Sequence, residues 1–580
     1  MGTADENVKN TNLSRENTTS KHADFKHLQE NYDAITDKQL PDYLHRGDIS
    51  SVNRFLGYHD AMMATCATFL VLPLRNLKSM VTIEDYAEKK KNHELPHEPI
   101  IVEGLAGYLD AMKEEFIMFF LGFLIICTIW ESNNVRTIVL KRYDDFLVLL
   151  GIFQMFATIM LPFSIALQGH WPEDHVTIVM TTVILIIINI LDIIMILYGF
   201  GCPRLLNMAI RDWSKKERRR FMLTMCIKPI FEICLVGIAG AFTFLNYKVS
   251  WILLGLLILW PVQRKLVFYL RRRKASENKQ EKSRFFYYFS KGQISKERVE
   301  AFTDAAVAII ACVLILDITV EDFPTIKKVK EEGLTAVLKH MNYEFLSFFG
   351  TYMAVSFLWY VNHTVIHLFH TVDSMVLYLQ KTFLAFLCLA PISNNMLMEF
   401  NHGDRNTQVA VLWASCIFFV ASITQVLMLA WGYYRGTKLI HQWAVFNKTC
   451  SVNHRQYSYI RWKVATLPFW SLIGILSHFG EGDIPSIITA VCIAGTLITF
   501  VVLKFFYMNH LGKVAIFSLQ RDATTSPMSA SEMEMRREIR DEIADGTVID
   551  EKDIHMSAVN ETERDIDEEL KRESVEEDNR

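Results

Sequence analysis

Twelve runs of mostly apolar residues, each close to the length of a membrane span, constrain the fold of this chain more than any other feature. The hydrocarbon core of a bilayer is roughly 30 Å thick, and an α-helix needs about 20 apolar residues to cross it. The mean hydropathy of +0.18 over 580 residues is high for a soluble protein. We therefore predict an all-α polytopic membrane protein with twelve transmembrane helices, at 58–77, 112–131, 144–166, 176–200, 222–245, 249–269, 300–320, 344–363, 374–394, 408–433, 462–479 and 485–507.

An internal duplication divides these spans into two sets of six. Trp130 precedes Pro162 by 32 residues, and Trp359 precedes Pro391 by the same 32 residues. Six is an even number, so each set returns the chain to the side of the membrane on which it began. The two repeats are therefore expected to be parallel, related by an axis along the membrane normal. The expected segments are an N-terminal tail at 1–50, repeat I at 51–270, a basic linker at 271–295, repeat II at 296–510 and a C-terminal tail at 511–580.

The charge of the loops predicts which side of the membrane the termini occupy. The loops that read VRTIVLKRYDD, RDWSKKERRR and RRRKASENKQEKSR are rich in Lys and Arg and fall on the side of both termini, whereas loops on the opposite side, such as QGHWPEDH, are not. Short loops rich in Lys and Arg face the cytosol, so we expect both termini to be cytosolic. The N-terminal tail should be largely disordered, and the C-terminal tail is acidic, with 19 acidic and 8 basic residues from Met528 to Arg580.

The first span of each repeat opens with the same short pattern. The first copy reads RFLGYHD from Arg54 to Asp60, and the second reads RVEAFTD from Arg298 to Asp304. A carboxylate at the start of a helix is stabilised by the helix dipole, and an Arg could pair with it. One such pattern would indicate only a capped helix entrance. Two copies, each leading into a span rich in small residues, favour a functional role.

Each opening span also carries a stripe of small or weakly polar residues. The spacing i, i+4, i+7, i+11 places side chains along one side of a helix. Such a stripe lets helices approach closely, and it can also surround a narrow water-filled path; the sequence leaves both interpretations open. The stripe consists of Ala61, Thr65, Thr68 and Leu72 in repeat I and of Ala305, Ile309, Cys312 and Leu316 in repeat II.

The two motifs resemble the transmembrane protein 175 family of endolysosomal potassium channels, whose two six-span repeats each open with Arg-x-x-x-Phe-Ser-Asp. The second copy is close to this pattern, with Phe302 in place and Thr303 for Ser. The first copy is looser, with Tyr58 for Phe and His59 for Ser. The resemblance extends over the membrane region, from about Arg54 to Tyr507.

The tryptophan landmarks of the second spans support the resemblance. Trp359 is followed four residues later by His363, as in the second span of the family. Trp130 is followed at the same distance by Asn134, which departs from that pattern.

The resemblance implies a homodimer in which the first spans of both repeats of two subunits enclose one pore with pseudo-fourfold symmetry. It implies that potassium ions, and also protons, cross the membranes of endosomes and lysosomes through this pore. The implied pore residues are a hydrophobic constriction at Thr65 and Ile309, a potassium-selective layer at Thr68 and Cys312, and a second apolar ring at Leu72 and Leu316.

Two of these positions depart from the family. Thr65 stands where the family usually has Ile or Leu, and Cys312 stands where animal members have Thr. A constriction that is half Thr dewets less readily than one made of four aliphatic side chains. We therefore expect a leakier or less selective pore than is typical of the family.

The resemblance also makes Asp60 and Asp304 candidates for sensing protons. His59 adds an imidazole beside Asp60, and an unperturbed histidine titrates at about pH 6.5. We expect His59 to shift the pH response of the pore. A histidine that is simply packed between helices is the alternative.

Four charged residues fall inside other spans. A charge at the bilayer centre costs at least about 2.5–3.5 kcal/mol on insertion scales. Lys228 and Glu232 are one helical turn apart, which predicts an ion pair within one helix. Asp192 and Lys381 could pair across helices or face a crevice.

Other classes of function find little support in the sequence. The ten cysteines show no metal-ligand spacing, and there is no P-loop, GxSxG or HExxH motif, so we expect no enzyme, no metal site and no cofactor. The acidic tail on a basic membrane body does not indicate nucleic acid as a partner, although the tails could bind cytosolic regulators. A secondary transporter with parallel six-plus-six repeats is the main alternative. The Gly-rich motif that such a transporter needs after its second span is not present in ESNNVRTIVLKRYDD.

Overall fold

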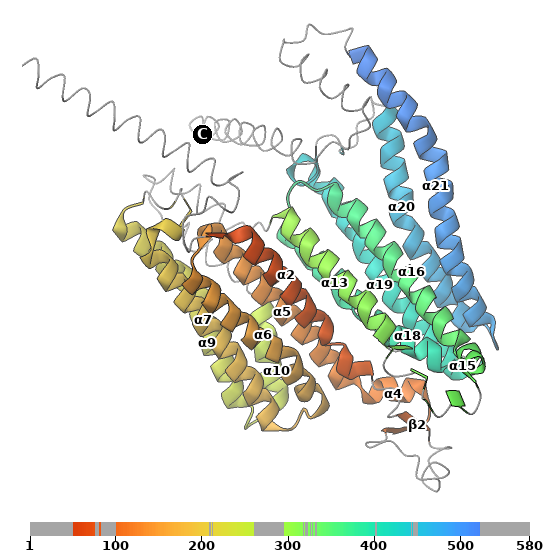
Figure 1. Ribbon diagram of the computed structural model, residues 1–580, viewed down its shortest axis with the longest axis horizontal. Helices are drawn as coiled ribbons and strands as arrows, with labels where there is room; N and C mark the ends of the chain where they lie inside the picture. Colours follow the sequence, from red (N-terminus) through yellow and green to blue (C-terminus); the bar gives the residue numbers. More distant parts are fainter. Residues whose placement is uncertain are drawn as a thin grey trace, which may run out of the picture. The chain divides into compact units, whose positions relative to one another are not determined.

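The computed structural model describes residues 50–75, 80–82, 100–207, 213–259, 295–316, 333–400, 403–441 and 451–522, with a few isolated residues between them. All but the last residue of the expected N-terminal tail, nearly all of the basic linker and the C-terminal tail beyond Asp522 lie outside the described residues. The described part is built almost entirely from helices (Figure 1).

The helices of each repeat follow the order of the expected spans. Repeat I contains α2 (Val52–Phe69), α5 (Lys113–Val139), α6 (Asp145–His170), α7 (His175–Gly201), α9 (Lys215–Phe242) and α10 (Tyr247–Gly255), which continues as the 3-10 turn η5 (Leu256–Leu259). Repeat II contains α13 (Lys296–Leu316), α16 (Asn342–His367), α17 (Ser374–Leu387), α18 (Ala390–Glu399), α19 (Arg405–Arg435), α20 (Ser451–Leu476) and α21 (Ile484–Asp522).

Within the described residues, nine helical segments are long and apolar enough to cross a membrane. The expected spans at 249–269, 344–363 and 462–479 fall on α10, α16 and α20, which do not reach that measure. α10 is short, α16 is rich in Tyr, Asn, Thr and His, and α20 carries Arg461 and Lys463. The total of twelve spans therefore stays a prediction.

The third span of each repeat begins with the same cap. The Asp144 side chain accepts a hydrogen bond from the Leu147 amide at the start of α6, and Asp373 accepts one from the Val376 amide at the start of α17, both at 2.9 Å. Each carboxylate satisfies an amide that the first helical turn leaves without a partner. The duplication is thus visible in the way equivalent helices begin.

The same spans differ at their prolines. α6 runs through Pro162 without interruption, whereas its counterpart is divided into α17 and α18 at Cys388 and Leu389, just before Pro391. Proline removes a backbone donor and crowds the preceding turn, so it can either kink a helix or end it. In repeat I the helix continues through its proline, and in repeat II the helix is interrupted just before it.

Four very short strands occur in the described residues. β1 (Ser50–Ser51) pairs antiparallel with β4 (Arg142–Tyr143), and β2 (Met80–Thr82) pairs in parallel with β3 (Ile100–Val102). Two short helices, α4 (Leu105–Ala111) and α15 (Leu334–His340), precede α5 and α16. The sequence does not predict the strands, because two or three residues are too few to show an alternating pattern.

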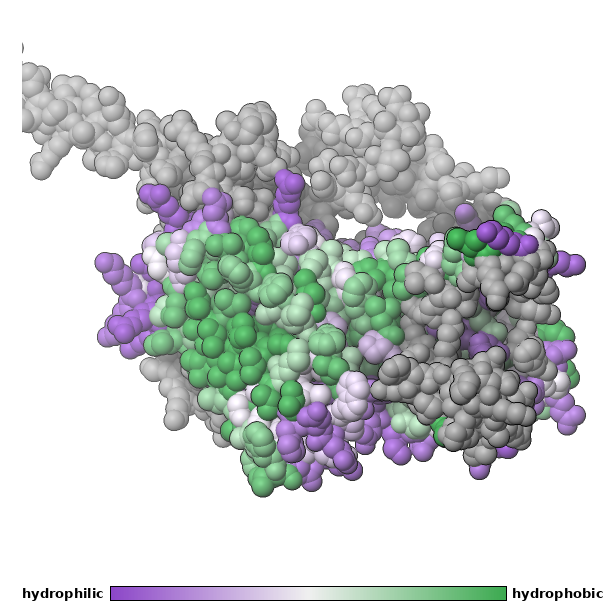
Figure 2. Space-filling model, turned by 60° about the horizontal axis from the view of Figure 1, so that its bottom comes forward, coloured by the Kyte–Doolittle hydropathy of each residue, from purple (hydrophilic) through white to green (hydrophobic). Residues whose placement is uncertain are grey.

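The first helices of the two repeats lie side by side, although they are far apart in the chain (Figure 1). Buried residues from both, such as Met63 of α2 and Phe302 of α13, belong to one hydrophobic core. On the outside, α6 and α7 expose large apolar side chains such as Phe153, Phe156 and Val183. Figure 2 shows a broad apolar surface, as expected for helices that face lipid.

Candidate functional site

The contact between α2 and α13 brings together the two motifs that open the repeats. Arg298 of α13 donates from Nη2 to Oδ1 of Asp60 in α2 at 2.6 Å, and from Nε to Oδ1 of Asn134 in α5 at 2.9 Å. The expectation that an Arg could pair with the Asp of its own motif is therefore wrong for Arg298. A spacing of six residues places two side chains about 120° apart around a helix axis, on different faces of the helix. The ion pair forms between the repeats instead.

A tryptophan from the following span holds each motif aspartate. Trp130 Nε1 donates to Asp60 Oδ1 at 2.8 Å, and Trp359 Nε1 donates to Asp304 Oδ1 at 2.7 Å. Both tryptophans are landmarks of the duplication in the sequence. The structure gives them the same hydrogen bond in both repeats.

The two copies of the motif differ in burial. Asp60 is 1% exposed, whereas Asp304 is exposed. Phe302 is buried and packs on Trp130, with ring centroids 4.6 Å apart. Its counterpart Tyr58 is 55% exposed. Arg298 and Phe302 of the second motif therefore reach across to repeat I, whereas Tyr58 of the first motif and Asp304 of the second lie at an open edge.

Other residues at this open edge are exposed as well. Arg54 is exposed, and no carboxylate among the described residues pairs with it. Trp359 is 36% exposed and stacks on His363, with ring centroids 5.7 Å apart. His363 stands where repeat I has Asn134, and it is exposed, whereas Asn134 is buried under Arg298.

His59 and Thr303 stand at the motif position that is Ser in the family, and each contacts an amide side chain. His59 is buried, and its Nε2 lies 2.6 Å from Nδ2 of Asn133. Thr303 is also buried, and its hydroxyl accepts a hydrogen bond from Nε2 of Gln380 at 2.8 Å. This geometry agrees with the packed alternative for His59; its effect on pH response stays a prediction.

The expected pore-lining stripe is only partly on the surface. In α13, Cys312 and Leu316 are exposed and Ile309 is half-buried. Thr65 of α2 and Leu72, in the 3-10 turn η2 (Leu72–Arg75) after α2, are half-buried. The Thr65 hydroxyl donates to the Ala61 carbonyl of its own helix at 2.8 Å.

Thr68 departs from this arrangement. It has no exposed surface, and its hydroxyl lies 3.0 Å from the carbonyl oxygens of Ala64 and Thr65. In this conformation Thr68 lies in the packed interior, whereas its counterpart Cys312 faces outward. Its place in a selective layer stays a prediction.

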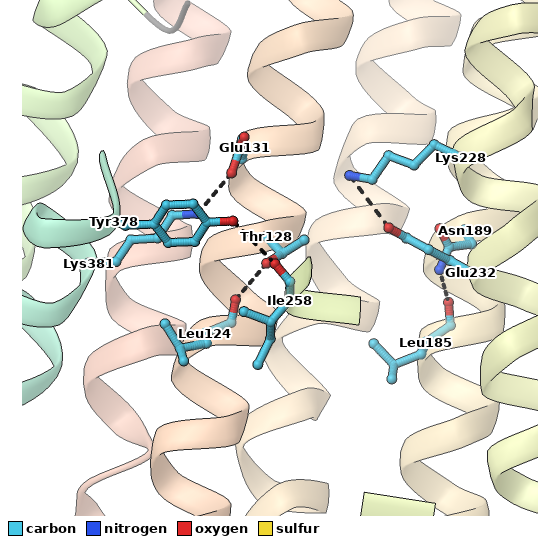
Figure 3. Close-up of polar contacts among 10 residues, drawn as sticks. All are labelled: Leu124, Thr128, Glu131, Leu185, Asn189, Lys228, Glu232, Ile258, Tyr378 and Lys381. Carbon is cyan, nitrogen blue, oxygen red and sulfur yellow. Dashed lines mark hydrogen bonds and ion pairs between the residues drawn. The ribbon is translucent and has the colours of Figure 1, made fainter. Parts of the chain in front are cut away.

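The ionisable residues inside other spans are paired. Lys228 and Glu232 form the expected ion pair, with Nζ 3.5 Å from Oε1 (Figure 3). Lys381 of α17 pairs with Glu131 of α5 at 2.8 Å (Figure 3). The sequence interpretation missed Glu131, because it placed the end of the second span at that residue.

Arg136 corrects one of the loops used to orient the chain. It was counted in the basic loop VRTIVLKRYDD, but α5 continues to Val139, and Arg136 is 3% exposed. Arg136 pairs with Asp192 of α7 and donates to Oε1 of Gln154 in α6 at 3.1 Å. A buried charge needs such partners, so Arg136 belongs to the helix packing of repeat I.

The described residues contain no group of three or more His, Cys, Asp or Glu that could hold a metal ion. The polar groups of the site instead bind one another. The arrangement joins α2 and α13 and leaves Arg54, Tyr58 and Asp304 exposed.

Comparison with known proteins identifies related sequences. Residues 54–162 and 298–391 match the family described as endosomal/lysosomal potassium channel TMEM175. The chain is 28% identical over 398 residues to the endosomal/lysosomal proton channel TMEM175 of Danio rerio, covering 67% of this chain and 72% of that protein. It is 27% identical over 446 residues to the protein of the same name from Homo sapiens, covering 75% of this chain and 83% of that protein.

A solved structure is also similar, at a low level. It is the crystal structure of a lysosomal potassium-selective channel TMEM175 homolog from Chamaesiphon minutus, with 20% identity and a TM-score of 0.29 over 36% of this chain and 97% of that chain.

The matched segments coincide with the landmarks of the duplication. They start at Arg54 and Arg298, the first residues of the two motifs, and they end at Pro162 and Pro391. The match therefore falls once on each repeat.

Proposed function

We propose, from the premise that this chain belongs to the endosomal/lysosomal potassium channel TMEM175 family, that it is a cation channel that passes potassium ions and protons. Members of the family are ion channels and not enzymes. The ions would pass through a narrow path between the first helices of both repeats, α2 and α13, from two subunits.

The observation that carries this proposal is the repeated contact at the start of α2 and α13. Both helices present a motif aspartate to a tryptophan indole, through bonds of 2.8 and 2.7 Å. They also lie side by side in one chain. Two helices that are equivalent by duplication and adjacent in space would form half of the pseudo-fourfold arrangement that we propose.

The exposed residues at the open edge support a second subunit as the other half of this arrangement. Within the chain, Arg298 and Phe302 of one repeat contact the other repeat. Their counterparts Arg54 and Tyr58 are exposed, as are Asp304 and Trp359, the groups that equivalent contacts would require. A second subunit, related by a two-fold axis, would complete these contacts and close the homodimer.

The proposed path keeps the residues implied by the family. Thr65 and Ile309 would form the constriction, and Leu72 and Leu316 a second apolar ring. Cys312 would contribute to the selective layer, and Thr68 would join it only after a rotation of α2, since it is buried in this conformation.

Ion-replacement currents test this function most directly. Wild-type protein in planar bilayers or enlarged endolysosomes should carry potassium currents, with a potassium/sodium permeability ratio below that typical of the family. The variants Thr65→Ile and Cys312→Thr should raise this ratio, because they restore an aliphatic constriction and a hydroxyl layer. Saturable uptake of an organic substrate without single-channel currents would instead favour the secondary transporter.

The proposed pH response has its own test. Asp60 and Asp304 are the candidate proton-sensing groups, and His59 is expected to shift the response. Currents of the His59→Ser variant at two lumenal pH values should differ in their pH dependence from those of the wild type. An unchanged response would assign His59 to packing against Asn133 alone.

The setting follows from the same premise. We place the protein in the membranes of endosomes and lysosomes as a multi-pass membrane protein, with both termini in the cytosol. Protease protection of tags at the two ends, in intact organelles, tests the orientation.

A further inference from the structure

One buried ion pair joins the two repeats of the chain. Lys381 of α17 and Glu131 of α5 lie 2.8 Å apart, from Nζ to Oε2, and both are less than 10% exposed. The ammonium group also lies 5.4 Å from the ring centre of Tyr378, whose hydroxyl contacts the backbone carbonyl of Ile258 (Figure 3). The pair is therefore enclosed by both repeats.

Each partner of this ion pair directly follows a residue that holds a pore helix. Glu131 follows Trp130, which donates to Asp60 in α2. Lys381 follows Gln380, which donates to Thr303 in α13. The ion pair thus connects the residues on which the two motifs depend.

These contacts, together with the ion pair between the motifs, form a closed ring of four helices. Each helix in the ring is joined to the next by a polar contact of 2.6–2.8 Å. In order around the ring, the contacts are Asp60–Trp130 between α2 and α5, Glu131–Lys381 between α5 and α17, Gln380–Thr303 between α17 and α13, and Arg298–Asp60 between α13 and α2.

The ion pair is specific to this junction. Tyr360 follows Trp359 in repeat II, in the place that Glu131 takes in repeat I. Ile152 follows the Asp144 cap at the same distance at which Lys381 follows the Asp373 cap. The equivalent positions therefore carry no charge.

A gain in folding stability alone does not explain the buried ion pair of Glu131 and Lys381. A buried ion pair is often no more stabilising than well-packed apolar side chains of similar size, but it restricts the alternatives that a packing can adopt. In this ring it joins α5 and α17, the two helices whose Trp130 and Gln380 bind α2 and α13.

We propose that Glu131 and Lys381 are positioning residues of the pore: their ion pair sets the spacing of α2 and α13 and thereby the width and selectivity of the ion path. This inference rests on the proposed channel function. It adds two residues that contact neither the expected constriction nor the ions.

The test uses a pair of substitutions that leaves no unpaired buried charge. The double variant Glu131→Gln/Lys381→Met should assemble like the wild type, since both charges are removed together. We expect its potassium/sodium permeability ratio or its open probability to change at least about threefold. The charge-exchanged variant Glu131→Lys/Lys381→Glu should move both quantities back toward the wild-type values, which a purely structural loss would not do.

A matched control is available in the same membrane region. Half-buried Lys228 and buried Glu232 form an ion pair within α9, which packs on α7 (Figure 3). The variant Lys228→Met/Glu232→Gln should leave permeability ratio and open probability unchanged.

The outcomes separate the two proposals. If wild-type protein carries no cation current, the proposed function fails. If the wild type conducts and the neutral double variant assembles but keeps the wild-type ratio and open probability, only the positioning role is overturned. A change of equal size in the control pair overturns it too, as does a charge-exchanged variant that assembles but behaves like the neutral one. Should the neutral variant fail to assemble, the charge-exchanged variant alone decides by the same two measurements.

Discussion

Arg298 and Arg54 begin equivalent motifs, yet their surroundings differ. Arg298 donates to Asp60 and Asn134 of the other repeat, whereas Arg54 is exposed. The next aromatic residues show the same contrast, since Phe302 is buried against Trp130 and Tyr58 is 55% exposed.

One chain contains one contact between the first helices of its two repeats, α2 and α13, and the difference follows from this. Arg298 and Phe302 of the second motif contact the other repeat within the chain. Their counterparts in the first motif, Arg54 and Tyr58, are exposed, and in the proposed homodimer they would contact the second subunit. Variants at equivalent positions should therefore act on different equilibria: folding of the subunit at one junction, and association of subunits at the other.

The largest expected effect separates the two arginines. Arg298→Ala would leave the carboxylate of Asp60, 1% exposed, without its ion-pair partner, and breaking a buried pair in this way costs about 3–5 kcal/mol. Arg54→Ala should change the free energy of unfolding of the isolated subunit by no more than about 0.5 kcal/mol and should lower the fraction of dimer. Unfolding in detergent and light scattering on the eluted species measure the two quantities.

This comparison has a clear contrary outcome. Equal losses of unfolding free energy in the two variants, measured on monomeric protein, would show that the motifs do not divide their roles in this way.

The aromatic positions should repeat the contrast on a smaller scale. Phe302→Ala removes a ring packed 4.6 Å from that of Trp130 and should lower the free energy of unfolding by about 3 kcal/mol. Tyr58→Ala should leave unfolding of the isolated subunit within about 0.5 kcal/mol of the wild type but weaken the dimer. Dimer formation that is unaffected in Tyr58→Ala would remove this residue from the subunit junction.

A smaller effect is expected at a helix cap outside the spans. Asp404 caps α19 by accepting from the amide and the hydroxyl of Thr407, both at 2.9 Å. Burial would raise the pKa of Asp404, but the hydrogen bonds from Thr407 outweigh it and lower the pKa of the carboxyl below its usual value. Loss of such a cap in Asp404→Ala should cost about 1 kcal/mol.

The pH dependence of this effect has a definite sign. A carboxylate with a lowered pKa stabilises the folded chain at pH values above the ordinary 3.8, and that stability is lost as the pH falls through the lower, folded-state pKa. The Tm difference between wild type and Asp404→Ala should therefore be constant from about pH 7 to about pH 5 and should shrink below about pH 4. A difference that grows on acidification would contradict the assigned cap.

Local patterns in the sequence were sufficient for much of the fold. The apolar runs place the helices, the Asp144 and Asp373 caps repeat as the duplication requires, and Lys228 and Glu232 pair as their spacing predicts. Such features depend on residues a few positions apart, and their periodicity is visible without a structure.

The contacts between repeats could not be read in this way. The ion pair of Arg298 with Asp60 joins residues 238 positions apart, and no local pattern indicates it. The sequence does not predict the burial of Glu131 and Arg136, because a charge next to an apolar run is read as the end of a span. A buried partner on another helix allows the span to continue past such a charge. The burial of Thr68 has a similar origin, since helix periodicity defines a face but not the neighbour that covers it.

The division of one span at Cys388 and Leu389 gives repeat II a joint that the unbroken α6 of repeat I does not have. Gln380 and Lys381 lie before that break, in α17, and bind α13 and α5; α18 lies after it. A bend at this break would turn α18 while leaving the hydrogen bonds within α17 intact. The same bend at the equivalent place in repeat I would have to break backbone hydrogen bonds inside the continuous helix α6.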